Sequence, residues 1–312
     1  MYDIVTVGSA TVDVFLRSSR FRIGDRGNEF LTLAGGKIEV EEKLVSVGGG
    51  GTNTAVGFSR LGLDCASVAR FGNDWAGEWL EKDLANETFD KRYLKKVEGE
   101  ETDLSVILLS QTGERIILVH RGKSRVDEAI FPLEILTSTR WLYLASLEGN
   151  VELLARLVDQ AQRNNVSVVL NPGNRELAQK EVLEKMFSKV KVLIVNEEEA
   201  KFFWGGKYQE KIKELKTEIV VVTCGKRGAY FWQGGEVLQE PAGQGKVVDA
   251  TGAGDAFATG LVAGLIWGYP LLKAVQAGMI ESLSVVGKVG AKTGLLTKEE
   301  LEEKLNLQEA VR

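Results

Sequence analysis

The residues Val247-Val-Asp-Ala-Thr-Gly-Ala-Gly-Asp-Ala-Phe257 combine an apolar run, a glycine-rich turn and the start of a helical pattern. The small residues Gly252, Ala253 and Gly254 let successive N–H groups point into one concavity at a helix N-terminus, which carries roughly half a positive charge. We therefore expect an anion hole at this turn. Asp255 follows in the first helical turn, where it either complements the helix dipole or accepts a proton from a substrate hydroxyl during phosphoryl transfer. The motif alone leaves both interpretations open.

A second glycine-rich loop, Val47-Gly-Gly-Gly-Gly-Thr-Asn53-Thr-Ala, also leads into a helical pattern. Four consecutive glycines cost more backbone entropy than a simple loop requires, which indicates that another group approaches this backbone closely. Asn53 offers donors and an acceptor, which suits a ligand with several hydroxyls. A flexible hinge between a hairpin and the main body is compatible with the same residues.

The remaining chain alternates between strand and helix patterns. Residues 1–8, 52–61 and 66–71 predict a βαβ unit. From Trp141 onward the alternation predicts a mostly parallel sheet covered by helices on both faces. The strands and helices expected there are 141–145, 151–163, 166–170, 175–187, 192–195, 197–204 and 219–223. After them we expect β-like runs at 229–231, 236–239 and 246–248, helices at 253–267 and 271–289, and a terminal helix behind a capping box at 297–300.

Two hairpin-like segments, about 14–47 and about 102–121, interrupt this pattern. Residues 104–110 are expected to pair with 115–120, and residues 29–47 show two β-rich runs broken by Gly35-Gly36. Because the segments are similar in character, we expect them to meet as one small sheet. The predicted fold is a single α/β domain over residues 1–312: a three-layer α/β/α arrangement with a mostly parallel central sheet and a small β-sheet lid.

Composition excludes several classes of protein. The 39 Lys and Arg against 44 Asp and Glu give a net charge of −5 without long blocks of one sign, so nucleic acid is not an expected partner. Two cysteines without a CxxC pair exclude a zinc site or disulfide framework. The single histidine, His120, excludes HExxH, and it is expected to be a polar residue at a strand end.

The sequence also lacks several common nucleotide-binding and catalytic motifs and any membrane-spanning segment. The chain contains no complete Walker A motif, no GxGxxG and no GxSxG. It also lacks an apolar run of about 18 residues and a signal-like N-terminus, so no membrane partner is expected and the chain is expected to be cytoplasmic. Small molecules or protein remain as the expected partners.

The motifs 249–257 and 48–55, in this order and about two hundred residues apart, resemble the two signatures of the ribokinase-like (PfkB) carbohydrate kinase family. Supporting segments span nearly the whole chain: 8–13, 35–36, 72–77, 170–172, 196–199 and 223–228. The resemblance implies ATP-dependent phosphorylation of an alcohol on a sugar or nucleoside, carried out on a large α/β domain closed by a β lid.

The resemblance also implies roles for individual residues. Asp255 would be the catalytic base, and the N–H groups of Gly252, Ala253 and Gly254 the anion hole. Glu199 would organise Mg²⁺ through water, and a monovalent cation near Asp249 is a further expectation. The residues expected to contact ATP are Asn171, Asn196, Glu199, Thr223 and Gly225. Those expected to bind the acceptor are Asp13, Gly36, Gly48, Gly49, Asn53 and Glu148.

Two departures from the family pattern bear on the acceptor. Gly50 stands where a ribokinase loop would carry lysine, and Arg121-Gly-Lys-Ser124 replaces a Gly-Ala-Asn stretch, so the chain departs from ribokinase itself. The matched acceptor residues include no fixed cation, which favours a neutral sugar or polyol over a sugar phosphate. Arg121 and Lys123 would reverse this preference if the lid brought them inward.

Other functions remain open beside a sugar or polyol kinase. A nucleoside kinase of the same family is the runner-up, because Phe15, Phe21 and Phe30 could form an apolar shelf for a base. A non-catalytic sugar- or nucleotide-sensing protein and a dehydrogenase are more remote. The runs 106–109 and 116–119 supply apolar side chains to both faces of the lid, so we also expect a homodimer formed through it.

Overall fold

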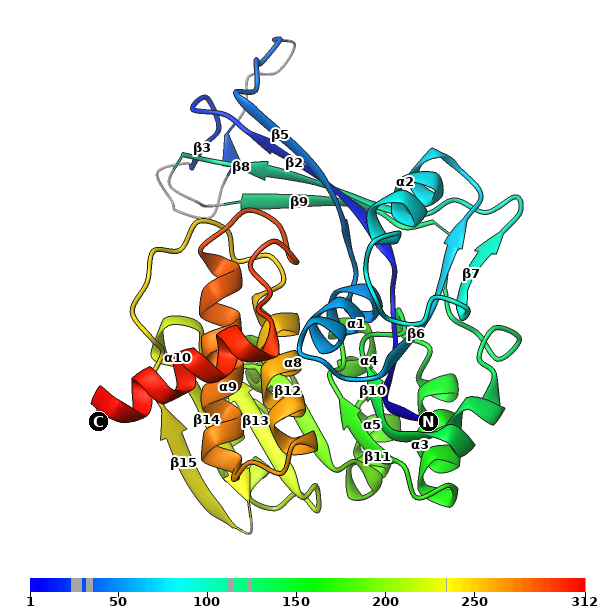
Figure 1. Ribbon diagram of the computed structural model, residues 1–312, viewed down its shortest axis with the longest axis vertical. Coiled ribbons are helices and arrows are strands. Elements are labelled where there is room, and N and C mark those ends of the chain that lie inside the picture. Colours follow the sequence, from blue (N-terminus) through cyan, green and yellow to red (C-terminus); the bar gives the residue numbers. More distant parts are fainter. Residues whose placement is uncertain (24–29, 32–35, 112–114, 123–124, 234, 312) are drawn as a thin grey trace.

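The computed structural model describes residues 1–23, 30–31, 36–111, 115–122, 125–233 and 235–311. Within these residues, a nine-stranded sheet is flanked by helices, and a four-stranded sheet stands over one end of it (Figure 1). The three-layer α/β/α fold with a β-sheet lid, expected from the sequence, is confirmed.

The central sheet has the order β15-β14-β13-β12-β11-β10-β1-β6-β7. Neighbours from β7 to β13 pair in parallel, whereas β14 and β15 are antiparallel. The strands are β1 (Tyr2–Val7), β6 (Cys65–Gly72), β7 (Leu94–Val97), β10 (Thr139–Leu144), β11 (Ser167–Leu170), β12 (Val192–Asn196), β13 (Ile219–Thr223), β14 (Ala229–Gln233) and β15 (Glu236–Glu240).

Helices cover both faces because successive strand residues bury their side chains on opposite sides. In β10, Tyr143 lies in a core with α1 and α8, while Leu142 and Leu144 lie in a second core with α3 and α6. The helices are α1 (Gly50–Arg60), α2 (Trp75–Leu84), α3 (Val151–Arg163), α4 (Asn174–Leu177), α5 (Lys180–Met186), α6 (Glu197–Trp204), α7 (Tyr208–Ile212), α8 (Ala253–Ile266), α9 (Leu271–Val286) and α10 (Lys298–Val311). Among the residues described, no helix is long and apolar enough to cross a bilayer.

The lid sheet has the order β5-β2-β8-β9, so the two segments predicted to meet do so. Its strands are β2 (Thr11–Arg17), β5 (Glu42–Gly48), β8 (Asp103–Leu109) and β9 (Arg115–His120). The predicted β8–β9 hairpin is confirmed, with Leu104 opposite His120. The lid begins at Thr11 rather than near residue 14, and β2 pairs with β8 in parallel, which the sequence did not indicate. A separate short pair joins β3 (Arg22–Ile23) to β4 (Phe30–Leu31), and Gly35 lies outside the described residues.

Three other expectations differ from the structure. The helix expected at 175–187 is divided into α4 and α5 near Gln179, whose side-chain amide donates to the carbonyl oxygen of Gly149. Residues 246–248 are not a strand; the N–H groups of Val248 and Asp249 donate instead to the carbonyl oxygen of Val286 at the end of α9, at 2.7 and 3.2 Å. The helix α2 and strand β7 were not anticipated. By contrast, the predicted capping box is present, since the N–H of Thr297 donates to Glu300 Oε2 at 2.8 Å.

Candidate active site

The two glycine motifs meet where the central sheet faces the lid. The amide Nδ2 of Asn53 donates to Asp255 Oδ2 at 2.9 Å, although the residues are 202 positions apart. A Cβ added to Gly50 would lie 3.8 Å from Asp255 Oδ1. The site is assembled because α1 and α8, which begin at these motifs, pack against each other.

The residues expected to form an anion hole lie at the N-terminus of α8. Gly252 is its N-cap in a left-handed conformation (φ +75°), and a Cβ there would lie 2.5 Å from the Cβ of Ala291. Gly254 is exposed, and a Cβ on it would meet no atom within 4 Å, so a ligand can reach this backbone. Burial raises the pKa of the adjacent Asp255 carboxyl, and the hydrogen bond from Asn53 opposes this effect.

The close approach predicted for the backbone of residues 48–51 is also present. Gly49 has φ +96°, and a Cβ on it would lie 2.4 Å from the carbonyl oxygen of Ser9. A Cβ on Gly48 would lie 2.0 Å from Asp13 Oδ2. The glycines therefore admit both the chain leading into the lid and the carboxylate of Asp13.

Asp13 is a buried carboxylate on β2, 7% exposed. Burial raises its pKa to about 6, whereas the Ser105 and Thr11 hydroxyls and the charge of Lys292 lower it. Lys292 is itself buried and forms an ion pair with Asp83 of α2. The sequence did not single out Lys292, because only the path of the chain after α9 brings it near the acceptor residues.

Arg121, which directly follows β9, joins Asp103 of the lid to Glu148 of the main body. Its Nη1 lies 2.7 Å from Glu148 Oε1 and 3.1 Å from Asp103 Oδ2, and Arg175 Nη1 lies 3.5 Å from Glu148 Oε2. Burial raises the pKa of Glu148, and the charge of Arg121 opposes this effect. The residues expected to bind the acceptor thus have cations beside them, but Arg121 is shared between two carboxylates. Lys123 lies outside the described residues.

The predicted ATP-side residues Asn196 and Glu199 form a capping box at the start of α6. The N–H of Glu199 donates to Asn196 Oδ1, and the N–H of Asn196 donates to Glu199 Oε2, both at 2.8 Å. Both residues line a hollow of about 340 Å³, together with Asn174, Glu198 and Phe202. Burial raises the pKa of Glu199, while its hydrogen bonds to Asn196 oppose this rise.

Asn171 directly follows β11, and its side chain forms hydrogen bonds to the neighbouring strands β12 and β10. Its Nδ2 donates to the carbonyl oxygen of Ile194 at 2.9 Å, and its Oδ1 accepts from the Tyr143 hydroxyl at 3.1 Å. Burial, followed by the charges of Asp255 and Glu199, raises the pKa of Tyr143 well above its usual value. Tyr143, which sequence reasoning missed, therefore lies within electrostatic range of both carboxylates.

The other residues expected to bind ATP, a cation or the acceptor lie on several separate elements. Thr223 lies opposite Asn196 in the register of β13 and β12, and a Cβ on nearby Gly225 would meet no atom within 4 Å. Asp249 accepts hydrogen bonds from the Thr251 hydroxyl at 2.7 Å and the Gly290 N–H at 3.0 Å. Gly36 is exposed beside residues outside the description, so its role stays a prediction.

An α/β/α domain with an aspartate beside a glycine-lined helix N-terminus and with a β-sheet lid is the arrangement expected of an ATP-dependent kinase that phosphorylates a hydroxyl group. The sequence pattern of the pfkB family carbohydrate kinases matches residues 1–298, and the chain belongs to this family. It is a ribokinase-like sugar or nucleoside kinase.

Known proteins show the same relationship. The ATP-dependent 6-phosphofructokinase of Thermoanaerobacterium thermosaccharolyticum is 26% identical over 93% of this chain and 89% of its own length. The crystal structure of Thermotoga maritima ribokinase has a TM-score of 0.81 at 25% identity, covering 98% of this chain and 100% of that chain. The Burkholderia thailandensis nucleoside kinase in complex with inosine shares the fold, with a TM-score of 0.78 at 18% identity over 97% of this chain and 98% of that chain.

Proposed function

We propose that the protein transfers the γ-phosphoryl group of ATP to a hydroxyl of a neutral sugar or related polyol, acting as one kinase domain over residues 1–312 with its lid inserted in two segments. The observation that carries this proposal is the hydrogen bond between Asn53 and Asp255, because it joins an acceptor-binding loop to the anion hole in a single site.

Asp255 acts as the base in this proposal. An aspartate with an ordinary pKa is a weak base for an alcohol, but in a loose phosphoryl-transfer transition state the proton leaves late. Burial raises the pKa of Asp255, which makes its carboxylate a better proton acceptor. The N–H groups of residues 252–254 stabilise the transferred phosphoryl group, and the lid excludes the competing acceptor, water.

Mg²⁺ fits the carboxylate of Glu199 through water. In the part of the chain described, no three His, Cys, Asp or Glu side chains converge on a direct metal site. Mg²⁺ usually keeps several waters and binds through one or two carboxylates together with the substrate phosphates. Bound Mg²⁺ would neutralise negative charge on the ATP phosphates, while Asn196 and Glu199 hold its water ligands. A monovalent cation beside the loop that Asp249 ties to Gly290 remains part of the proposal.

The charges around the acceptor support a neutral sugar. Asp13, Asp103 and Glu148 face this region, while Arg121 is paired with two of them and Lys292 with Asp83. An acceptor phosphate would have to compete with these carboxylates for cations that are already paired. A phosphorylated sugar, the kind of acceptor that the phosphofructokinase relative's name indicates, is therefore placed third.

A nucleoside is the second candidate, which the inosine complex of the Burkholderia kinase favours. Of the rings proposed as a shelf for its base, Phe15 is 2% exposed and packs with Ile107 and Leu109 in the lid, and Phe21 is also buried. The side chain of Phe30 lies outside the description. Because these two rings pack within the protein, we favour a sugar over a nucleoside as the acceptor.

The deciding experiment follows ADP release with ATP, Mg²⁺ and a panel of sugars, polyols, nucleosides and sugar phosphates. The expected result is the highest kcat/KM with a neutral sugar or polyol. A nucleoside that exceeds every sugar by a wide margin would reverse the order, and ADP release that no acceptor stimulates would favour a sensing protein.

A further inference from the structure

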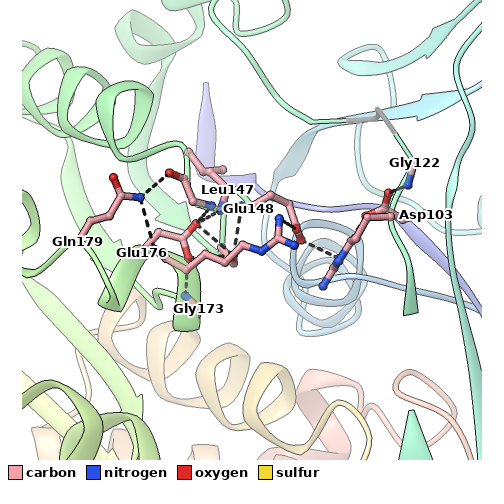
Figure 2. A network of polar contacts seen from close by, with 11 residues as sticks. Asp103, Gly122, Leu147, Glu148, Gly173, Glu176 and Gln179 are labelled. Atoms are coloured by element: carbon pink, nitrogen blue, oxygen red, sulfur yellow. Dashed lines mark hydrogen bonds and ion pairs between the residues drawn. The ribbon is translucent and has the colours of Figure 1, made fainter. Parts of the chain in front are cut away.

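Glu176 is a completely buried glutamate on α4 that belongs to none of the sequence motifs. Its Oε1 accepts from the backbone N–H groups of Leu147 at 2.8 Å and Gly149 at 2.7 Å (Figure 2). Its Oε2 accepts from the N–H of Gly173 at 2.9 Å, and the Ser146 hydroxyl donates to both oxygens at 3.1 and 3.0 Å. These donors satisfy a carboxylate whose burial would otherwise be costly.

The loop that Glu176 binds has an unfavourable backbone. Glu148 has φ +59°, which lies in the left-handed region that residues other than glycine rarely adopt. Such a conformation persists when the surroundings over-determine it, and it is often found at functional sites. The residues on either side of Glu148 donate to the same oxygen of Glu176, so Glu176 supplies that constraint.

This backbone directs Glu148 toward the lid. Its carboxylate pairs with Arg121 at 2.7 Å, and Arg121 pairs with Asp103 at the start of β8. In the parallel register of β2 and β8, Asp103 lies opposite Thr11 and Ser105 opposite Asp13. Because side chains two residues apart in a strand share a face, Asp103 lies on the face of the lid that carries Asp13.

We propose that Glu176 is a positioning residue for the acceptor site: it fixes residues 146–149 so that Glu148 holds Arg121, and with it the lid, over the acceptor. Glu176 does not touch the acceptor in this scheme. The inference rests on the proposed function, in which the acceptor lies between Asp13 and Asp255.

The first test is Glu176→Gln, which keeps the side-chain volume but turns an amide NH₂ toward N–H donors. The acceptor KM should rise about tenfold or more, while the ATP KM stays within about twofold of wild type. Glu181→Gln, the same change at an exposed position on the neighbouring α5, is the control and should leave both values unchanged. An unchanged acceptor KM in folded Glu176→Gln protein overturns the inference.

The second test is a double-mutant cycle with Glu148→Gln. If Glu176 acts through Glu148, the double variant should lose about as much acceptor kcat/KM as the more severe single variant. Additive losses would show that Glu176 does not act through Glu148, which would overturn the proposal. If Glu176→Gln does not fold, Ser146→Ala removes one donor to the same carboxylate, and an unchanged acceptor KM in that variant would equally overturn the proposal.

The two proposals fail in different ways. Wild-type protein without acceptor-dependent ADP release contradicts the proposed function before any variant is compared. Active wild-type protein whose Glu176→Gln variant matches it in acceptor KM contradicts only the role of Glu176.

Discussion

At the scale of single residues, Asp255 gives the most direct prediction. Asp255→Asn should lower kcat by about 10²–10⁴, the range for loss of a general base, because an amide cannot take up the hydroxyl proton. The ATP KM should change little, since the anion hole is made of backbone N–H groups. Steady-state ADP release measures both values. Asp64→Asn, at an exposed position, is the control, and near wild-type turnover of Asp255→Asn would exclude Asp255 as the base.

Glu199→Gln should raise the Mg²⁺ concentration needed for half-maximal activity. Glutamine can still complete the capping box with Asn196, so α6 should remain intact while the negative charge is lost. A magnesium titration at saturating ATP and acceptor measures the effect. The exposed neighbour Glu198→Gln is the control. An unchanged requirement in Glu199→Gln would mean that residues 197–199 are only a helix start.

Lys292→Met should move the acidic limb of the pH profile of acceptor kcat/KM to higher pH. Asp13, with a pKa of about 6, accepts stronger hydrogen bonds from hydroxyls when it is ionised, so kcat/KM should fall as the pH drops through that value. Loss of the ammonium group makes protonation of Asp13 easier, which raises its pKa. Asp255 contributes to the same limb, so the difference between variant and wild type is the quantity measured. Lys288→Met, in the same loop, is the control, and coincident profiles would contradict this role of Lys292.

At the scale of elements, the edge strand β9 exposes four consecutive apolar residues, among them Ile117 at 42% and Leu118 at 51%. We propose that this surface pairs two lids in a homodimer, because an apolar edge strand readily associates. Leu118→Lys should shift the protein toward monomer in light scattering. Leu238→Lys, on the edge strand β15 at 49% exposure, is the matched control. A concentration-independent mass near 34.2 kDa for the wild type would contradict the homodimer.

The sequence predicted correct bounds for those helices whose start and periodicity are specified by neighbouring residues. Helices α3 and α6 were predicted at their observed bounds, and both begin at an asparagine cap, Asn150 and Asn196. The pairing of β2 with β8 and the irregular path of residues 246–248 depend on contacts distant in sequence, which periodicity does not contain. The same limit applies to the site.

The glycine motifs identified Asp255 and Asn53, because the backbone conformation that each motif requires depends on consecutive residues. Tyr143, Glu176 and Lys292 reach the site only through the packing of elements that follow no shared motif. Their residue types carry no local signal, so the sequence alone could not select them from the other tyrosines, glutamates and lysines.

At the scale of the whole molecule, the residues proposed for the acceptor site are divided between the lid and the main body, with Asp13 on β2 and Asp255 on α8. A ligand that bridges them should stabilise the folded protein, by about 2.7 kcal/mol at a concentration of one hundred times its Kd. Thermal unfolding should therefore show a larger rise in Tm with a neutral sugar than with the corresponding sugar phosphate. A larger rise with the phosphate would reverse the proposed order of acceptors independently of turnover.

Both parts of the lid occupy connections of the central sheet: β2 to β5 lie between β1 and α1, and β8 and β9 between β7 and β10 (Figure 1). The proposed anion hole and Asp255 lie outside these two connections, at the start of α8. Substitutions, insertions or exchanges in the first two connections can therefore change what covers the acceptor while the transfer chemistry is inherited intact. Such a chain can acquire new acceptors during evolution, or by grafting of these two loops in the laboratory, without rebuilding its catalytic centre.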